Sequence, residues 1–274
     1  MYGLNRPTSE DGVAVTVEGR ETLHSNQGSL PPLVLIPAYN EAATVGDVVR
    51  RVCEAGFPTL VVDDGSTDAT ATRAARAGAS VIRMPVNLGV GAALRCGYRW
   101  AVARGFTVVV QVDGDGQHRP ESVASLVEAL DSLDADLVIG SRFVDGGSGP
   151  AVGIARRVAM RVLARSASRA AGSPITDATS GFRAVRGELL VAFADSYPRE
   201  YLGDTVEALV RAGRAGYVVR EVPAHMDRRA GGTASAAGVR ASLLLVRALL
   251  AVWLRVGHPL PAPDRGAVVG SGAS

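Results

Sequence analysis

The sequence predicts an α/β fold in which a mostly parallel sheet is covered by helices on both faces. The first observation is that, after residue 32, apolar runs of four to seven residues alternate with longer segments of helical period. The second is composition: 274 residues with 47% hydrophobic and 20% charged residues are typical of a globular chain with a sizeable core. Strands that alternate with helices favour parallel pairing, because each crossover between parallel strands needs a long connection.

The expected elements follow the chain in regular order. The strands, which share a short apolar run bounded by turn residues, are expected at Leu33–Ile36, Thr59–Asp63, Ser80–Arg83, Phe106–Val112, Asp136–Gly140 and Tyr217–Val222. Helices are expected from about Glu41, Thr67, Val90 and Pro120, and over Ile154–Ala170 and Asp204–Ala212. In such a sheet, ligands bind beyond the carboxyl ends of the strands.

We interpret residues 31–257 as one catalytic domain, because no internal repeat divides them, and we expect 1–30 and 258–274 to be disordered. The N-terminus has no apolar segment of the kind a secretory signal needs, so a cytoplasmic protein is expected. The apolar segment Ala241–Val256 is shorter than the roughly 20 residues of a spanning helix, and is expected to pack on the domain or lie at a membrane interface. A net charge of +2 without a basic stripe argues against nucleic acid.

The stretch VQVDGDGQH places two acidic residues at the end of an expected strand. Side chains alternate along extended chain, so Asp113 and Asp115 project to the same side, with Gly114 between them. Two like charges held together favour a divalent cation, which could carry the phosphates of a substrate. The alternative is an acidic turn that closes the strand, since Asp and Gly are ordinary turn residues.

Polar residues also follow the first two strands. Asn40 is expected to cap the helix that begins near Glu41, and Ser66 or Thr67 to cap the next one. Asp64 is then left facing the crevice at the strand ends, where a carboxylate can accept from the ring N–H of a nucleobase.

Several motifs together resemble a known family. In order along the chain they are IPAYNEA, VVDDGSTDAT, NLGVGAALRCGYRWA, VQVDGDGQHRPE, VIGSRF and DATSGFRAV. Their order and approximate spacing resemble family 2 glycosyltransferases of the GT-A fold, and most closely the dolichol-phosphate and polyprenol-phosphate sugar synthases. The resemblance covers about Pro32 to Ser235. One departure is Val90, which stands where the family commonly has a lysine.

The resemblance implies a set of site residues. Mg²⁺ or Mn²⁺ on the donor diphosphate would be held by Asp113, Asp115 and Gln117. The nucleoside pocket would be lined by Pro37, Tyr39, Glu41, Asp64 and Asp113. Cations near the phosphates would be Arg142, Arg183 and Arg229. The catalytic residues would be Asp177, which acts on the acceptor, and Arg183.

The function implied is metal-dependent, inverting transfer of a sugar from a GDP- or UDP-sugar to a polyprenyl phosphate or another small acceptor. Guanine and uracil both carry a ring N–H donor, so the donor base stays open. A nucleotide-sugar isomerase of the pyranose–furanose mutase type on the same scaffold is the alternative. A nucleotide-sugar-binding protein without turnover is a third interpretation. Peripheral contact with the inner face of a membrane would accompany a lipid-phosphate acceptor.

Overall fold

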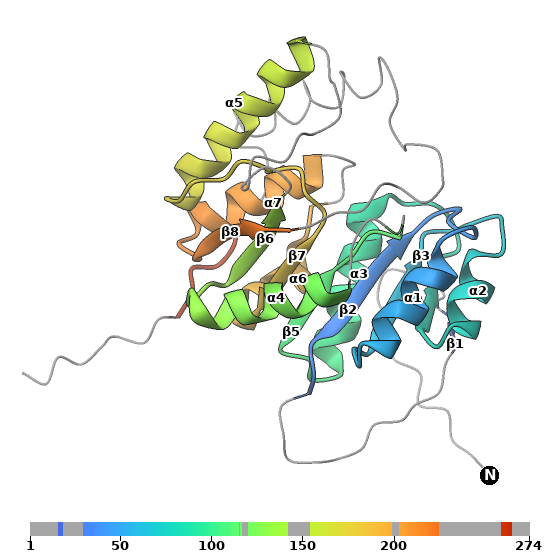
Figure 1. The fold of residues 1–274 in the computed structure, drawn as a ribbon. Coiled ribbons are helices and arrows are strands. Elements are labelled where there is room, and N and C mark those ends of the chain that lie inside the picture. Colours follow the sequence, from blue (N-terminus) through green and yellow to red (C-terminus); the bar gives the residue numbers. More distant parts are fainter. Residues whose placement is uncertain are drawn as a thin grey trace, which may run out of the picture.

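The computed structural model describes residues 16–18, 30–114, 116, 120–141, 154–198, 203–224 and 259–264. Eight strands form one sheet in the order β1-β4-β3-β2-β5-β7-β6-β8 (Figure 1). The strands are β1 (Thr16–Glu18), β2 (Leu33–Ala38), β3 (Thr59–Asp63), β4 (Ser80–Arg83), β5 (Val108–Gln111), β6 (Leu137–Ser141), β7 (Arg183–Arg186) and β8 (Val219–Pro223). The helices are α1 (Val45–Glu54), α2 (Thr70–Arg76), α3 (Val90–Ala103), α4 (Pro120–Ser132), α5 (Ile154–Ala171), α6 (Gly187–Ser196) and α7 (Gly203–Arg214).

Strand pairing confirms the expected mostly parallel sheet and adds two exceptions, one at the edge and one between β5 and β6. Strand β1 pairs antiparallel with β4 at the edge. Strands β4, β3, β2 and β5 run parallel, and β6 is parallel to β8. Strand β7 pairs antiparallel with both β5 and β6. The chain entering β7 therefore approaches the sheet at the carboxyl ends of its two neighbours.

The two faces of the sheet carry separate hydrophobic cores, as the period-two alternation of strand side chains requires. On one face, Leu33 and Leu35 of β2 pack with residues of α3, α5, α6 and α7. On the other, Val34 and Ile36 pack with residues of α1, α2 and α4. Figure 1 shows these helices covering the sheet from both sides. The expected α/β fold is confirmed.

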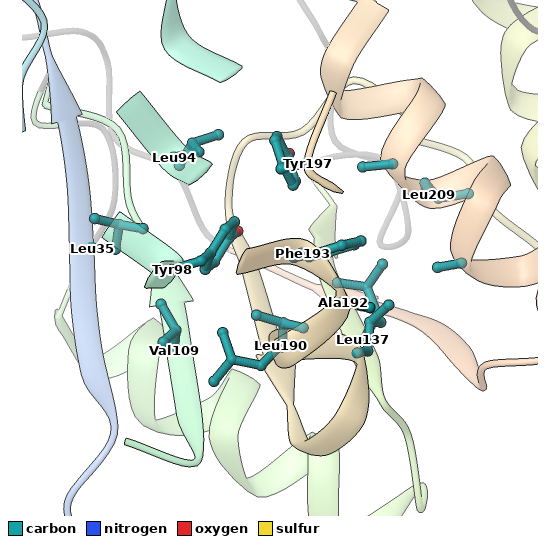
Figure 2. Close-up of a cluster of buried hydrophobic side chains, with 14 of the residues drawn as sticks. Leu35, Leu94, Tyr98, Val109, Leu137, Leu190, Ala192, Phe193, Tyr197 and Leu209 are labelled. Carbon is teal, nitrogen blue, oxygen red and sulfur yellow. The ribbon is translucent and has the colours of Figure 1, made fainter. Parts of the chain in front are cut away.

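Aromatic rings strengthen the first of these cores (Figure 2). The Tyr98 ring of α3 lies 5.8 Å from Phe193 and 5.4 Å from Tyr197, measured between centroids. Phe193 and Tyr197 meet edge to face at 5.1 Å, the geometry that aromatic quadrupoles favour. These contacts join α3 to α6 across the middle of the sheet.

The expected boundaries mostly agree with the structure, and the departures are local. Strand β7 and helix α6 were missed. Strand β1 was also missed, and it lies within the segment expected to be disordered. In the segment expected to be a disordered tail, Leu260 is 7% exposed and belongs to the core, and the Asp264 N–H donates to Glu188 Oε2. Elsewhere the two terminal segments lie outside the described residues.

No helix within the described ranges is long and apolar enough to cross a membrane. The segment Ala241–Val256 lies outside those ranges.

Candidate functional site

The turn that follows β5 lies between two loops from different parts of the chain. A Cβ placed on Gly181 would lie 2.6 Å from Asp113 Oδ1 and 2.9 Å from Oδ2, so the carboxylate sits directly against the Gly181 backbone. On the other side, a Cβ on Gly114 would lie 3.7 Å from Glu41 Cγ. Asp113 thus lies where the loop after β2 meets the loop before β7.

The antiparallel direction of β7 explains how the Gly181 loop reaches this place. Arg183, the first residue of β7, is paired with Gln111 near the end of β5 and with Ile139 near the end of β6. Residues just before it therefore project beyond the carboxyl ends of both strands. A parallel strand in this position would have placed that loop at the opposite edge.

The loops after β2 and β3 are tied together by side chains expected to cap helices. The Asn40 N–H donates to Ser66 Oγ at 2.8 Å, and Asn40 Oδ1 accepts from the Thr67 N–H at 3.0 Å. The capping prediction was wrong for all three residues: α1 begins at Val45 after Thr44, and α2 begins at Thr70 after Ala69. Their polar atoms instead bind across the loops.

Two further hydrogen bonds link the loop after β2 to the loop after β3. The Glu41 N–H donates to Thr70 Oγ1 at 2.9 Å, and the Ala42 N–H donates to Asp68 Oδ2 at 3.2 Å. Asn40 itself has φ of +53°, a left-handed conformation that Asn tolerates better than most residues. Tyr39 remains 47% exposed beside this rigid turn, and Pro37 is partly buried.

Asp64 has a role that the sequence did not indicate. Its side chain is 3% exposed, and its two carboxylate oxygens accept the N–H groups of Leu88 and Gly89, each at 2.8 Å. Burial raises the pKa of Asp64, the two N–H bonds lower it, and the neighbouring charge of Asp63 raises it further. The expectation that Asp64 is uncommitted was wrong, because it holds the loop that starts α3.

Asp177 lies in the loop before β7 and is 1% exposed. Its Oδ1 accepts from the Thr179 hydroxyl at 3.1 Å, and its backbone carbonyl accepts from the Ser180 N–H. Ser180 Oγ donates to the Gly140 carbonyl at 2.7 Å, which ties this loop to the end of β6. Residues 177–180 therefore form a hydrogen-bonded turn.

Glu221 of β8 is a site-organising residue that sequence reasoning missed. Its Oε1 accepts from the Asp177 N–H at 2.7 Å, and its Oε2 accepts from the Thr176 N–H and hydroxyl at 2.8 and 2.9 Å. Thr176 also shares a hydrogen bond with Ser141 at the end of β6. A signal was present in the sequence, since a glutamate inside an apolar strand needs a polar partner.

Arg183 is bound by the protein itself rather than presented to the crevice. It is 3% exposed, with Nε donating to the Ser180 carbonyl at 2.7 Å. Nη1 donates to Thr205 O at 2.7 Å, and Nη2 donates to Ala178 O at 3.0 Å. A phosphate contact would require these buried carbonyls to lose their donors. The geometry gives Arg183 a structural role in place of the implied phosphate role.

The other implied residues divide between the described and undescribed parts of the chain. Pro37 lies near the end of β2. The described residues that follow β2, β3 and β5 at the same edge of the sheet are Tyr39, Glu41, Asp64 and Asp113. Outside the described residues lie Asp115, Gln117, Arg142 and Arg229. Within the described ranges no three His, Cys, Asp or Glu side chains form a metal cluster. The partly buried Asp113 carboxylate, held in a space that a Cβ on Gly181 would fill, is an oxygen ligand of the kind hard divalent cations take.

The Arg183 arrangement predicts a stability effect. Arg183→Lys keeps the charge but cannot supply three donors in a planar fork, so at least one buried carbonyl loses its bond. We expect a loss of about 1–3 kcal/mol in the free energy of unfolding, measured by denaturant titration. Arg186→Lys is the control in the same strand, because Arg186 pairs with the exposed Asp131 and Asp134, and should cost below about 1 kcal/mol. Unchanged stability of Arg183→Lys with weakened nucleotide binding would contradict the structural role.

Comparison with known proteins identifies the family of the chain. The family profile described as glycosyl transferase family 2 matches residues 33–193, which include β2, β3, β5 and β7. Polyprenol monophosphomannose synthase of Mycolicibacterium smegmatis is 36% identical over 222 residues, 75% of this chain and 81% of its own length. Undecaprenyl-phosphate mannosyltransferase of Micrococcus luteus is 34% identical over 216 residues, covering 76% of this chain and 88% of its own.

Solved structures show the same fold. Glucosyl-3-phosphoglycerate synthase from Mycobacterium tuberculosis, solved with Mn²⁺, UDP-glucose and phosphoglyceric acid, superposes with a TM-score of 0.60. At 22% identity it covers 84% of this chain and 86% of its own. The profile match, the two relatives and this superposition agree with one another: the chain is a glycosyltransferase of family 2 with the GT-A fold.

Proposed function

We propose that this glycosyltransferase moves a sugar from a GDP- or UDP-linked donor to a polyprenyl phosphate, with inversion at the sugar carbon and with a divalent metal. The observation that carries the proposal is the position of the Asp113-Gly114 turn, where Gly114 lies near Glu41 of the first strand-end loop and Asp113 lies against Gly181 of the loop before β7. The names of the two relatives support a polyprenyl-phosphate acceptor.

The nucleoside would lie on the loops after β2 and β3. The two loops are joined by hydrogen bonds between their own residues, so substrate binding would need little further ordering. Tyr39 is exposed at this turn and can pack against a base. Asp64 can contact a base only through a second lone pair, because each of its oxygens already accepts one N–H. Its larger effect would be to fix the Leu88-Gly89 turn beside the pocket.

The metal would be held by Asp113 together with Asp115 and Gln117. A solved relative of the fold contains Mn²⁺ and UDP-glucose, which supports a divalent ion here. When bound, such an ion supplies Lewis-acid stabilisation of the negative charge on the departing diphosphate. Asp113 would contribute a carboxylate whose position is restricted on one side by the Gly181 backbone.

The acceptor would approach from the loop at residues 176–181. In an inverting reaction the acceptor oxygen forms its bond to the sugar carbon as the bond to the diphosphate oxygen breaks on the opposite face. An ionised phosphate oxygen needs no base, so Asp177 would orient the acceptor; a hydroxyl acceptor would transfer its proton to Asp177. Glu221 would position Asp177 through its backbone N–H. Because a polyprenyl chain is apolar, we place the reaction at the cytoplasmic surface of a membrane, reached by peripheral contact.

A product assay tests the proposal directly. The full chain is incubated with GDP- and UDP-sugars and Mn²⁺ or Mg²⁺, with and without polyprenyl phosphate. We expect free nucleoside diphosphate and glycosylated lipid to appear only with acceptor, and EDTA to abolish both. A rearranged nucleotide sugar formed without acceptor would instead show that the protein is an isomerase. Full turnover in the presence of EDTA would show that the reaction does not need a divalent metal.

Asp177→Asn separates acceptor chemistry from loop structure. The amide keeps an oxygen for the Thr179 hydroxyl but removes the charge, so melting temperature and nucleotide affinity should hold. Turnover should fall by roughly 10²–10⁴-fold, the usual contribution of a positioned acid or base. Asp195→Asn, on the exposed side of α6, is the control and should leave turnover unchanged. Near-normal turnover of Asp177→Asn would exclude Asp177 from the reaction.

A further inference from the structure

Asp68 binds two consecutive backbone amides of the loop after β2, one directly and one through Thr70. Its Oδ2 accepts from the Ala42 N–H at 3.2 Å, and its Oδ1 accepts from both the hydroxyl and the N–H of Thr70. Thr70 Oγ1 in turn accepts from the Glu41 N–H at 2.9 Å. Thr70 is fully buried, whereas Asp68 is exposed. A charge at the surface is thus linked through a buried hydroxyl to the backbone of Glu41.

The charge of Asp68 sets the direction of these hydrogen bonds. An ionised carboxylate can only accept, so the Thr70 hydroxyl donates its single proton to Asp68 and keeps a lone pair for the Glu41 N–H. Desolvation raises the pKa of Asp68, but the hydrogen bonds that it accepts from Thr70 and Ala42 lower the pKa by more. Asp68 therefore stays ionised near neutral pH, and the Thr70 hydroxyl keeps one orientation.

Arg73 adds a third contact to the same loop. Its Nη1 donates to the Ala42 carbonyl at 2.6 Å, so side chains bind both polar backbone atoms of Ala42. Asp68 precedes α2, and the other two residues belong to this helix, which lies beside α1 in Figure 1. We call Asp68, Thr70 and Arg73 the α2 clamp.

The Glu41 side chain reaches from the clamped loop to the candidate site. The Thr44 hydroxyl donates to Glu41 Oε2 at 3.1 Å, which restricts the direction of the side chain. A Cβ on Gly114 would lie 3.7 Å from Glu41 Cγ, so the Glu41 side chain lies close to the turn that contains Asp113. A shift of the Glu41 backbone would therefore move a side chain that borders the proposed metal and nucleotide site.

We propose that the α2 clamp positions Glu41 for binding of the donor nucleotide. The clamp holds the Glu41 side chain beside the Asp113-Gly114 turn before the donor arrives. Because a loop that is already ordered needs less of the donor's binding free energy for ordering, loss of the clamp weakens donor binding. The inference rests on the proposed function, since it assumes that a nucleotide and a divalent metal bind at this edge of the sheet.

Two substitutions open the clamp with little change in side-chain shape. Thr70→Val leaves the Glu41 N–H without its acceptor. In Asp68→Asn the amide has a single oxygen, so either the Thr70 donors or the Ala42 N–H face an NH₂ group and lose their acceptor. Circular dichroism verifies that each variant is folded.

Calorimetry with Mn²⁺ and UDP or GDP measures the effect. We expect whichever nucleotide binds the parent to bind each variant roughly 10–100-fold more weakly, the usual cost of removing a residue that orients the groups of a metal site. In the sugar-transfer assay the KM for the donor should rise while kcat is retained, the pattern of a lost interaction that acts equally in the ground and transition states. A residue that only stabilises the fold would change neither value in the folded protein.

Four control variants separate the clamp from charge, hydroxyl content and stability. Thr70→Ser keeps the hydroxyl and should restore binding. Asp47→Asn removes the same charge from an exposed side chain of α1, and Thr72→Val removes an exposed hydroxyl of α2. Val52→Ala lowers stability from the buried side of α1 without touching the clamp. All four should bind the nucleotide as the parent does.

Amide hydrogen exchange of the nucleotide-free protein, followed by NMR, gives a second test. We expect faster exchange at Glu41 and Ala42 in the two clamp variants, with core amides unchanged. Unchanged exchange at both amides, or parent-like nucleotide affinity in both folded variants, would overturn the proposal. An equal loss of affinity in Thr70→Ser or Val52→Ala would do the same. If the parent itself binds neither nucleotide, the proposed function fails and the positioning role fails with it, an outcome distinct from failure of the clamp variants alone.

Discussion

The contact between the Asp113 carboxylate and the Gly181 backbone is the constraint on which the rest of the site depends. Any side chain at 181 would occupy the space of the carboxylate oxygens. The contact arises because β7 is antiparallel between β5 and β6, so that its entry loop returns to the carboxyl ends of both. A single reversed strand thus brings the expected metal-binding turn against the loop that contains Asp177.

The site is organised by buried polar bonds more than by apolar packing. Asp64 holds the start of α3, Arg183 holds the loop before β7, and Glu221 holds Thr176 and Asp177. Each of these charged groups costs free energy to bury, and each is compensated by backbone donors or acceptors that would otherwise lack partners. Removing one therefore disturbs a whole loop. For substitutions at this edge of the sheet, stability and turnover therefore have to be measured separately.

Most of the fold could be predicted from the sequence because the spacing of apolar residues, which distinguishes strands from helices, is a property of neighbouring residues. Strands β3 and β4 and helix α3 began where their patterns indicated. Strand β7 was missed since its four residues, RAVR, have no apolar run, and the side chains that identify it bind residues distant in sequence. The same limit explains the errors at Asn40 and Ser66, where local patterns suggested helix caps although the partners lie up to 27 residues away. For Arg183 the family resemblance implied a phosphate contact, whereas one of its partners, the Thr205 carbonyl, lies 22 residues away. The metal-binding role of Asp113 and the acceptor role of Asp177 were expected from several motifs that occur in the order seen in the family. Such an ordered set of motifs indicates a function more specifically than a single residue does.

Gly181→Ala tests the central constraint most directly. A Cβ there would displace the Asp113 carboxylate, which can rotate, so the protein should stay folded with a melting temperature within a few degrees of the parent. We measure Mn²⁺-dependent binding of UDP and GDP by calorimetry, with Gly46→Ala as control because a Cβ at Gly46 makes only ordinary contacts, at 3.8 Å or more. The account predicts that whichever nucleotide binds the parent and the control binds the folded Gly181→Ala variant at least about tenfold more weakly, a change of roughly 1.4 kcal/mol. Metal-dependent affinity equal to that of the parent would contradict it.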